Sequence, residues 1–243
     1  MSIICDISGV LRDVASLMLP RTCLACGREL LENEGCVCLA CCYNMPLTNF
    51  AKHKENPIKL LFENVLPVES ATAMFWFVGG TEWQRIIHHF KYYGRWFFAQ
   101  KMGEWLGREL RDSGNFEEVD LVVPIPLHYG RRLRRGYNQS EQLALGVARE
   151  MGVKYEFRSV RRCLYNDSQT SKNYRERWDN VEDIFEVRSV DKLRGKHLLL
   201  VDDVLTTGAT MASCASAIIK ACNGDVKISI ASLSVSRRII DGR

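Results

Sequence analysis

Two pairs of cysteines with identical spacing constrain this sequence more than any other feature. Cys23-Leu-Ala-Cys26 and Cys38-Leu-Ala-Cys41 are CxxC pairs separated by eleven residues. Two intervening residues let both sulfurs of a turn face one point, and two such turns complete a tetrahedron around Zn²⁺. A segment this short cannot build a core of its own, so metal binding should supply most of its folding free energy. The spacing predicts a structural zinc ribbon.

Other cysteines leave alternatives open. Seven of the ten cysteines lie within the first 42 residues, and Cys36 and Cys42 could each replace one of the four ligands. Reduced thiols without metal, or a redox-active pair, are the other interpretations, although neither explains why the pair occurs twice. Charged residues interrupt the apolar N-terminal stretch, so we expect no secretory signal there. We therefore expect a cytoplasmic chain whose cysteines are thiols or metal ligands rather than disulfides.

The composition is typical of a globular chain. Hydrophobic residues make up 47% and charged residues 26%, and the net charge of +4 is too small to argue for nucleic acid by itself. No apolar run approaches the roughly 18 residues of a membrane span.

A polar stretch over residues 49–59 predicts a joint between a module over residues 1–60 and a domain over residues 61–243. The module is expected to open with an amphipathic helix that docks on the core or, alternatively, on a membrane surface; its apolar positions are Ile4, Ile7, Leu11, Val14 and Met18.

Strand and helix patterns alternate through residues 61–243. Residues 121–123 form a short apolar strand that ends at Pro124-Ile125-Pro126, and residues 198–201 are apolar at every position, as in a strand covered on both faces. A third strand pattern, over residues 226–233, follows a helical stretch over 211–221. The alternation predicts a mostly parallel α/β sheet with ligands beyond the carboxyl ends of its strands. Helical stripes are predicted at Trp83, Ile86, Ile87 and Phe90, at Met102, Leu106 and Leu110, and at Leu143, Val147 and Met151.

Residues 198–210 carry the most informative pattern, Leu-Leu-Leu-Val-Asp-Asp-Val-Leu-Thr-Thr-Gly-Ala-Thr. A buried strand delivers Asp202 and Asp203 to its end, and a threonine-glycine loop then leads into a helix. Loop N–H groups, hydroxyls and a helix N-terminus make an anion site. Carboxylates would repel a phosphate unless they met its hydroxyl groups or a metal ion. We therefore expect a phosphorylated sugar with a vicinal diol; solvated carboxylates beside a threonine-rich helix cap are the alternative.

The same stretch resembles the phosphoribosyl pyrophosphate (PRPP) motif of type I phosphoribosyltransferases. The rest of the chain, over roughly residues 17–234, resembles one branch of that superfamily, the ComF family of competence-related proteins. The segments that carry this resemblance stand in the family's order; they are the double CxxC ribbon, Phe90-Lys91-Tyr92, Pro124 through His128, Arg135-Gly-Tyr-Asn-Gln139, and Gln169 through Asn180.

The resemblance implies a type I phosphoribosyltransferase-like sheet and a PRPP site. Asp202 and Asp203, the implied catalytic pair, would bind the ribose hydroxyls with or through Mg²⁺. Residues 206–210 would hold the 5-phosphate, and the loop at 126–130 would carry the pyrophosphate. The residues implied to bind PRPP are Leu127, His128, Arg131, Arg135, Asp202, Asp203, Thr206, Thr207, Gly208, Ala209 and Thr210. A further segment would be a mobile loop over PRPP, or else a disordered surface loop; it contains Gln169, Ser171, Arg175 and Asn180.

Basic and amide residues after the first core strand allow several interpretations. Arg131, Arg132, Arg134 and Arg135 form a cluster without an acid, which suits a pyrophosphate, a nucleic-acid track or a solvated basic face. Asn138 is expected to cap the helix that follows. Gln139, in the first turn of that helix, could face solvent or the site.

Two functions follow from these features. The first is a phosphoribosyltransferase-like enzyme that binds PRPP and Mg²⁺ and transfers a phosphoribosyl group to an unidentified acceptor, with a link to DNA uptake implied by the family. The second is a non-enzymatic DNA-uptake factor that binds single-stranded DNA or a competence-machinery protein, and whose domain binds PRPP only as a regulatory ligand or binds no ligand. No general base is demanded, and His88, His89 and His128 are only weak candidates. Aromatic side chains that could stack on bases mostly fall on stripes expected to be core; they are Trp76, Trp83, Tyr92, Tyr93 and Trp96.

Overall fold

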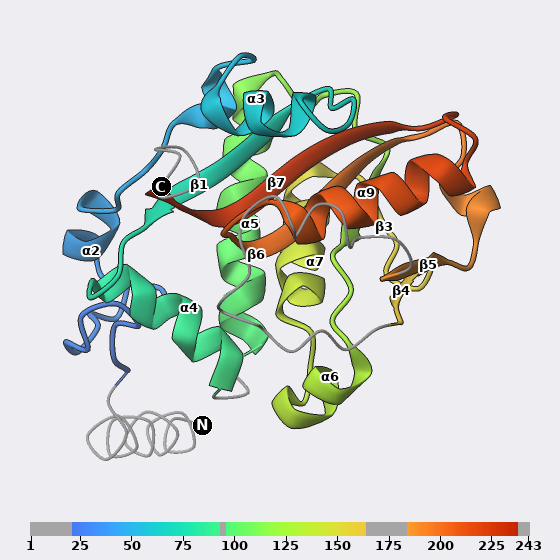
Figure 1. Cartoon of the computed structure of the whole chain (residues 1–243). Coiled ribbons are helices and arrows are strands. Elements are labelled where there is room, and N and C mark those ends of the chain that lie inside the picture. Colours follow the sequence, from blue (N-terminus) through green and yellow to red (C-terminus); the bar gives the residue numbers. More distant parts are fainter. Residues whose placement is uncertain (1–20, 93–95, 164–183, 238–243) are drawn as a thin grey trace, which may run out of the picture.

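The computed structural model describes residues 21–92, 96–163 and 184–237, without the side chains of residues 88–92 and of Arg131, Arg134 and Arg135 (Figure 1). The N-terminal helix predicted before residue 20 and the loop predicted around Gln169 to Asn180 lie outside these ranges. No described helix is long and apolar enough to cross a membrane.

Within the described residues, five parallel strands form one sheet in the order β1-β7-β6-β2-β3. The central strand β6 pairs with β2 on one side and with β7 on the other, so that Leu200 lies opposite both Val123 and Ile230. This sheet confirms the predicted α/β fold class. The strands are β1 (Ala71–Phe77), β2 (Leu121–Pro124), β3 (Lys154–Tyr155), β6 (His197–Leu205) and β7 (Lys227–Ser236).

Helices cover both faces of the sheet (Figure 1). Helices α5 (Trp96–Ser113) and α7 (Gln139–Met151) pack on one face, and α3 (Pro57–Glu63) and α9 (Ala209–Ala221) pack on the other. The remaining elements are α2 (Leu39–Tyr43), α4 (Glu82–Tyr92), α6 (Tyr129–Arg135), the antiparallel hairpin of β4 (Val160–Arg162) and β5 (Phe185–Val187), and 3-10 turns at Phe50–Lys52 and Val190–Lys192.

The apolar run of β6 is shared between two cores. Leu199 and Val201 join the cluster that contains α5 and α7, whereas Leu198 and Leu200 join the cluster that contains α3 and α9. All four side chains are fully buried. The expectation of a strand covered on both faces is therefore confirmed, and so are the helical stripes of α4, α5 and α7 at Trp83, Ile86, Ile87, Met102, Leu106, Leu110, Leu143 and Val147.

Helices α5 and α7 approach each other so closely that glycine is required at the contact. A Cβ on Gly103 would collide with the Leu143 carbonyl oxygen, and one on Gly146 would collide with the Gln100 carbonyl oxygen. This approach fixes α7, whose first turn faces the carboxyl ends of β2 and β6.

The cysteine-rich segment packs on the larger domain. Cys23, Leu24 and Val37 belong to the same buried cluster as Trp83 on α4 and Met102 on α5. The polar stretch predicted as a joint contains a 3-10 turn and the start of α3, which Asn56 caps by accepting hydrogen bonds from the N–H groups of residues 58 and 59. The division at residue 60 stays a prediction.

Candidate functional site

The chain leaves the neighbouring strands β2 and β6 toward opposite faces of the sheet. After β2 it continues through α6 to α7, and after β6 it continues directly into α9. Since α7 and α9 cover different faces, the carboxyl ends of β2 and β6 form a topological switch point. Open α/β sheets bind ligands at such points.

The acidic pair lies inside β6 rather than after it. β6 runs to Leu205 because β7 continues the hydrogen-bonding ladder, with Asp202 opposite Ser232 and Val204 opposite Ser234. The predicted strand over residues 198–201 was therefore too short. Asp202 and Asp203 are both half-buried.

One oxygen of Asp202 has two hydrogen-bond donors. Its Oδ1 accepts a hydrogen bond of 2.7 Å from the Ser140 hydroxyl and one of 2.9 Å from the backbone N–H of Asp203. Ser140 lies in the first turn of α7, 62 residues away in the sequence, and no pattern in the sequence pointed to it.

The loop after β6 leads directly into α9. Gly208 is the N-cap residue of α9, with a φ of 79°, and the backbone N–H of Ala209 donates to Thr207 Oγ1 at 3.4 Å. Thr206 is exposed, and Thr207, Ala209 and Thr210 are partly exposed, so a ligand can reach them.

Helix α3 also contacts this loop, which the sequence did not indicate. A Cβ at Gly208 would lie 3.2 Å from Cζ of Phe62 and 3.4 Å from Cδ2 of Leu61. Phe62 is fully buried, so it cannot move aside easily. The loop is therefore supported from the α3 side of the sheet.

The loop after β2 is shorter than predicted. The N–H of Ile125 continues the ladder to Val201, and α6 already begins at Tyr129 because His128 caps it, with Nδ1 accepting from the Gly130 N–H at 3.2 Å. Leu127 and His128 thus lie in this loop, just after the point where β2 pairs with β6 at Pro124 and Val201.

Helix α6 carries the arginine cluster. Arg132 is exposed and lies 3.4 Å from Glu141 of α7, so one of the four arginines has an acidic partner that the local sequence did not show. Arg131 and Arg135 belong to the same helix, but their side chains lie outside the described part of the structure.

The start of α7 confirms the predicted Asn138 cap and shows that Gln139 does not face solvent. Asn138 caps the helix by accepting from the Ser140 N–H at 3.1 Å, and its amide also donates to the Ile125 carbonyl at 3.1 Å. Gln139 is 2% exposed, so its side chain does not face solvent.

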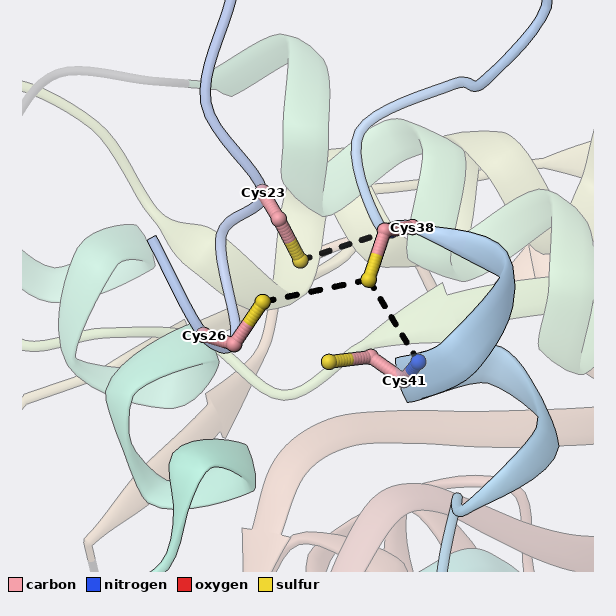
Figure 2. Close-up of side chains that lie close together, drawn as sticks. All are labelled: Cys23, Cys26, Cys38 and Cys41. Carbon is pink, nitrogen blue, oxygen red and sulfur yellow. Dashed lines mark hydrogen bonds between the residues drawn. The ribbon is translucent and has the colours of Figure 1, made fainter. Parts of the chain in front are cut away.

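A second site is formed by the four predicted cysteines (Figure 2). The sulfurs of Cys23, Cys26, Cys38 and Cys41 all lie within 4.8 Å of one another, and those of Cys26 and Cys38 are 3.8 Å apart. A tetrahedron with Zn–S bonds of about 2.3 Å has sulfurs about 3.8 Å apart. The cluster could therefore hold a metal ion.

Neighbouring groups favour the thiolate form of one cysteine of this cluster, Cys38. The N–H of residue 38 donates to Sγ of Cys23 at 3.3 Å, and the N–H of residue 41 donates to Sγ of Cys38 at 3.5 Å. Burial opposes ionisation of Cys38, but hydrogen bonds from the Arg28 side chain and from the N–H of Cys41 lower its pKa to about 6. Thiolates are the form that binds metal.

Glu34 organises the turn around these cysteines, a role that the sequence did not signal. Its nearly buried carboxylate accepts from Arg28 at 2.6 Å and from the N–H groups of Leu31 and Leu39 at 2.9 and 2.8 Å. The two backbone N–H groups and the Arg28 charge lower the pKa of Glu34. The bond to Leu39 ties Glu34 to the start of α2.

Cys36 and Cys42 do not join the cluster. Among the described residues, the group that could hold a metal consists of the other four cysteines. The Cys42 thiol faces the Val37 carbonyl oxygen at 3.8 Å, and burial raises the pKa of Cys36 to about 11. Burial raises the pKa of Cys42 as well, so both side chains favour the neutral thiol.

Residues 137–238 match the family model of the phosphoribosyl transferase domain, a range that includes α7, β6, the acidic pair and α9. The chain is thus a protein with a phosphoribosyltransferase domain, as its PRPP-like motif predicted. It is 28% identical to DNA utilization protein YhgH of Salmonella typhimurium over 148 residues, which cover 60% of this chain and 63% of that protein. It is 27% identical to competence protein F of Haemophilus influenzae over 130 residues, which cover 52% of this chain and 57% of that protein. The chain is thus similar to proteins of the ComF/YhgH family over more than half of its length, which agrees with the resemblance seen in its motifs.

These matches span less than two thirds of the length of the curated relatives. Among solved structures, glutamine PRPP amidotransferase from B. subtilis aligns with a TM-score of 0.41 and 18% identity, covering 60% of this chain and 30% of that one.

Proposed function

We propose that this protein binds PRPP together with Mg²⁺ at the carboxyl ends of β2 and β6. The observation that carries the proposal is the continuous arrangement of Asp202 and Asp203 on β6, the threonine-glycine loop, and the N-terminus of α9 at the switch point of the sheet. The phosphoribosyl transferase domain match over residues 137–238 includes all of it.

Each part of PRPP has a chemically suitable counterpart. The 5-phosphate is an anion, and the loop at 206–210 offers backbone N–H groups, hydroxyls and the positive end of a helix dipole. The ribose 2- and 3-hydroxyls are donors, and the carboxylates of Asp202 and Asp203 accept hydrogen bonds from them.

The pyrophosphate is assigned to the loop and helix that follow β2. Leu127 and His128 lie in the loop, and Arg131 and Arg135 belong to α6, which begins at the next residue. Guanidinium groups bind phosphate oxygens through charge-assisted, often bidentate hydrogen bonds. Carboxylate oxygens are ligands that suit Mg²⁺, so the acidic pair fits this ion, which when bound neutralises charge on the pyrophosphate.

We further propose that the protein transfers the phosphoribosyl group. In this reaction the bond between C1 of the ribose and the pyrophosphate oxygen breaks, the electron pair leaves with pyrophosphate, and an acceptor nucleophile forms the new bond to C1. Arginines at the leaving group and carboxylates at the ribose act by positioning and by charge stabilisation. No side chain of the chain is assigned as a general base.

Calorimetric titration of the full chain with PRPP, with and without Mg²⁺, tests the binding proposal. A protein with both Asp202→Asn and Asp203→Asn should lose about 3–6 kcal/mol of Mg²⁺-dependent affinity, because two hydrogen bonds to charged groups are lost. Its unfolding free energy should hold or rise, since adjacent like charges repel. Equal PRPP affinity in this variant would refute the site. Pyrophosphate release from PRPP with a panel of acceptors tests turnover separately.

We also propose that the four-cysteine cluster holds structural Zn²⁺. All four ligand positions of a tetrahedral ion are then occupied by protein sulfurs, which leaves no position for a reacting molecule. The distances between the sulfurs and the buried position of the cluster support this role.

Contact with single-stranded DNA is a second candidate function, and α6 favours it. Tyr129 and Leu133, one turn apart on this arginine-rich helix, are 69% and 67% exposed. Exposed apolar side chains among cations suit the bases and phosphates of a single strand. Of the other aromatics, Trp96 is exposed, whereas Trp83 is in the core and Trp76 packs on Phe50. The curated names of the relatives, which refer to DNA utilization and competence, agree with this candidate.

A further inference from the structure

Three hydrogen bonds connect the end of β2 to the acidic pair through the first turn of α7. The Asn138 amide donates to the Ile125 carbonyl at 3.1 Å, and the Ser140 N–H donates to Asn138 Oδ1 at 3.1 Å. The Ser140 hydroxyl then reaches Asp202 Oδ1 at 2.7 Å. Asn138 and Ser140 are only 2% and 5% exposed, so water does not replace these bonds easily.

The direction of the last bond follows from the chemistry of its two groups. An ionised carboxylate only accepts hydrogen bonds, so the Ser140 hydroxyl must donate its single proton to Asp202. The same oxygen also accepts from the N–H of Asp203 at 2.9 Å. Rotation of the Asp202 carboxylate would break both bonds, and the Ser140 hydroxyl would be left buried.

The helix itself does not need this hydroxyl. Asn138 already caps α7 and satisfies the Ser140 N–H, so the serine side chain adds nothing to the cap. Serine is also a weaker helix former than alanine. A small hydroxyl side chain at this buried position is therefore explained by its bond to Asp202 rather than by the start of the helix.

We propose that Ser140 is a positioning residue, which holds the Asp202 carboxylate in one orientation before the sugar phosphate arrives. A carboxylate that is already oriented loses less conformational freedom when it meets the ribose hydroxyls or the metal ion, and binding is tighter for that reason. This inference rests on the proposed PRPP site. It adds a residue of α7 to a site otherwise assigned to β6, to the loop before α9, and to the loop and helix α6 that follow β2.

Ser140→Ala and Ser140→Thr form the test pair, because alanine removes the hydroxyl and threonine keeps it. Calorimetry with PRPP and Mg²⁺ should show about 10- to 100-fold weaker binding for Ser140→Ala, as expected for one lost hydrogen bond to a charged group. Ser140→Thr should restore most of the affinity. Both should keep the thermal unfolding midpoint of wild type to within a few degrees.

Ser229→Ala is the matched control for a lost buried hydroxyl. Ser229 is fully buried on β7 and bonds His197 at 2.8 Å, at the opposite end of the sheet from the acidic pair. This control should bind PRPP as wild type does. A Ser140→Ala protein that binds as tightly as the control would overturn the inference while leaving the PRPP site intact.

A crystal structure of Ser140→Ala supplies a readout that does not depend on PRPP. We expect the Asp202 carboxylate to rotate away from its wild-type orientation. An unchanged carboxylate would overturn the positioning role, whatever ligand the site binds. If wild type itself failed to bind PRPP, the proposed function would be refuted, and the orientation of Asp202 would still decide the role of Ser140.

Discussion

Gly208 is required at its position for two reasons that can be separated by experiment. Its φ of 79° lies in the left-handed region that favours glycine, and a side chain there would also meet Phe62 of α3. Gly224 has the same φ of 79° but open space around it. The two glycines therefore share this φ but differ in the packing around them.

Gly208→Ala should lower the free energy of unfolding more than Gly224→Ala does. Both replacements cost about 1 kcal/mol or more from backbone strain, and Gly208→Ala adds about 1–3 kcal/mol because Phe62 must shift. Urea unfolding of both variants and wild type measures the difference. Equal losses at the two positions would contradict the contact with α3. Gly208→Val should lose more again, because a β-branched side chain is stiffer.

Single residues show both what the sequence could predict and what it could not. Asp202, Asp203 and Gly208 stand within seven residues of each other, so their roles could be predicted from a local pattern. Ser140 and Asp202 are 62 residues apart, and a lone serine at a helix start has many ordinary explanations. Contacts of this kind depend on where the folded chain brings its elements together, which residue spacing does not encode.

At the scale of elements, we expect the cysteine-rich segment to depend on its four proposed zinc ligands for its fold. Cys23→Ser deletes a proposed zinc ligand, so we expect it to lower the metal content below the one Zn²⁺ per chain predicted for wild type and to unfold the segment around residues 21–43. Metal analysis and amide hydrogen exchange measure the two effects. Cys163→Ser is the control, since Cys163 is an exposed thiol on the β4 side of the hairpin. If wild-type protein prepared without chelator contained no zinc, the proposed zinc site would be refuted.

Helix α5 carries a carboxyl group whose burial should make stability depend on pH. Burial raises the pKa of Glu109 from 4.5 to about 7, and Lys52 opposes the shift. The folded state therefore holds this proton over the interval in which the unfolded chain releases it. The stability that protonated Glu109 contributes is complete below pH 4.5 and is lost as the pH rises through about 7.

Glu109→Gln should remove this loss. Between pH 5 and pH 8, we expect the unfolding free energy of Glu109→Gln to change less than that of wild type. At pH 8, we expect the unfolding free energy of the variant to exceed the wild-type value by up to about 3 kcal/mol. His197, whose pKa burial lowers from 6.5, acts in the opposite sense and is present in both proteins, so its effect cancels in the comparison. The exposed Glu117→Gln serves as control. Parallel pH profiles of wild type and Glu109→Gln would contradict the prediction.

The elements themselves were predictable where one strand or helix carries its own pattern. The uninterrupted apolar run at residues 198–201 predicted a central strand, and the spacing of Met102, Leu106 and Leu110 predicted α5. The end of β6 was not predictable, because the ladder from β7 carries the strand on through the two aspartates. The position of α3 over Gly208 was not predictable either, since it follows from tertiary packing.

At the scale of the whole molecule, the switch point brings together two anion-binding candidates from distant parts of the chain. The loop before α9 and the arginine-rich α6 follow neighbouring strands, so both face the same end of the sheet. One extended phosphorylated ligand such as PRPP could contact both. A single strand of DNA along α6 would use the arginines and leave the loop before α9 uninvolved.

Paired measurements on α6 distinguish these two uses. If the arginines serve pyrophosphate, Arg131→Ala and Arg135→Ala should weaken PRPP binding, each by about 1.5–3 kcal/mol for a lost charged hydrogen bond, and leave any DNA affinity mostly intact. If they serve DNA, the logarithm of the affinity for a single strand should fall linearly with the logarithm of salt concentration, and each lost arginine should reduce that slope by about 0.7.

Arg194→Ala is the control, because Arg194 is exposed just before β6 begins and thus lies at the amino end of the sheet. Fluorescence anisotropy with a labelled oligonucleotide at several salt concentrations, beside calorimetry with PRPP, supplies both readouts. If the protein did not bind DNA at low salt, the proposal that α6 binds single-stranded DNA would be refuted. If both arginine variants bound PRPP as tightly as wild type, α6 would not be part of the PRPP site.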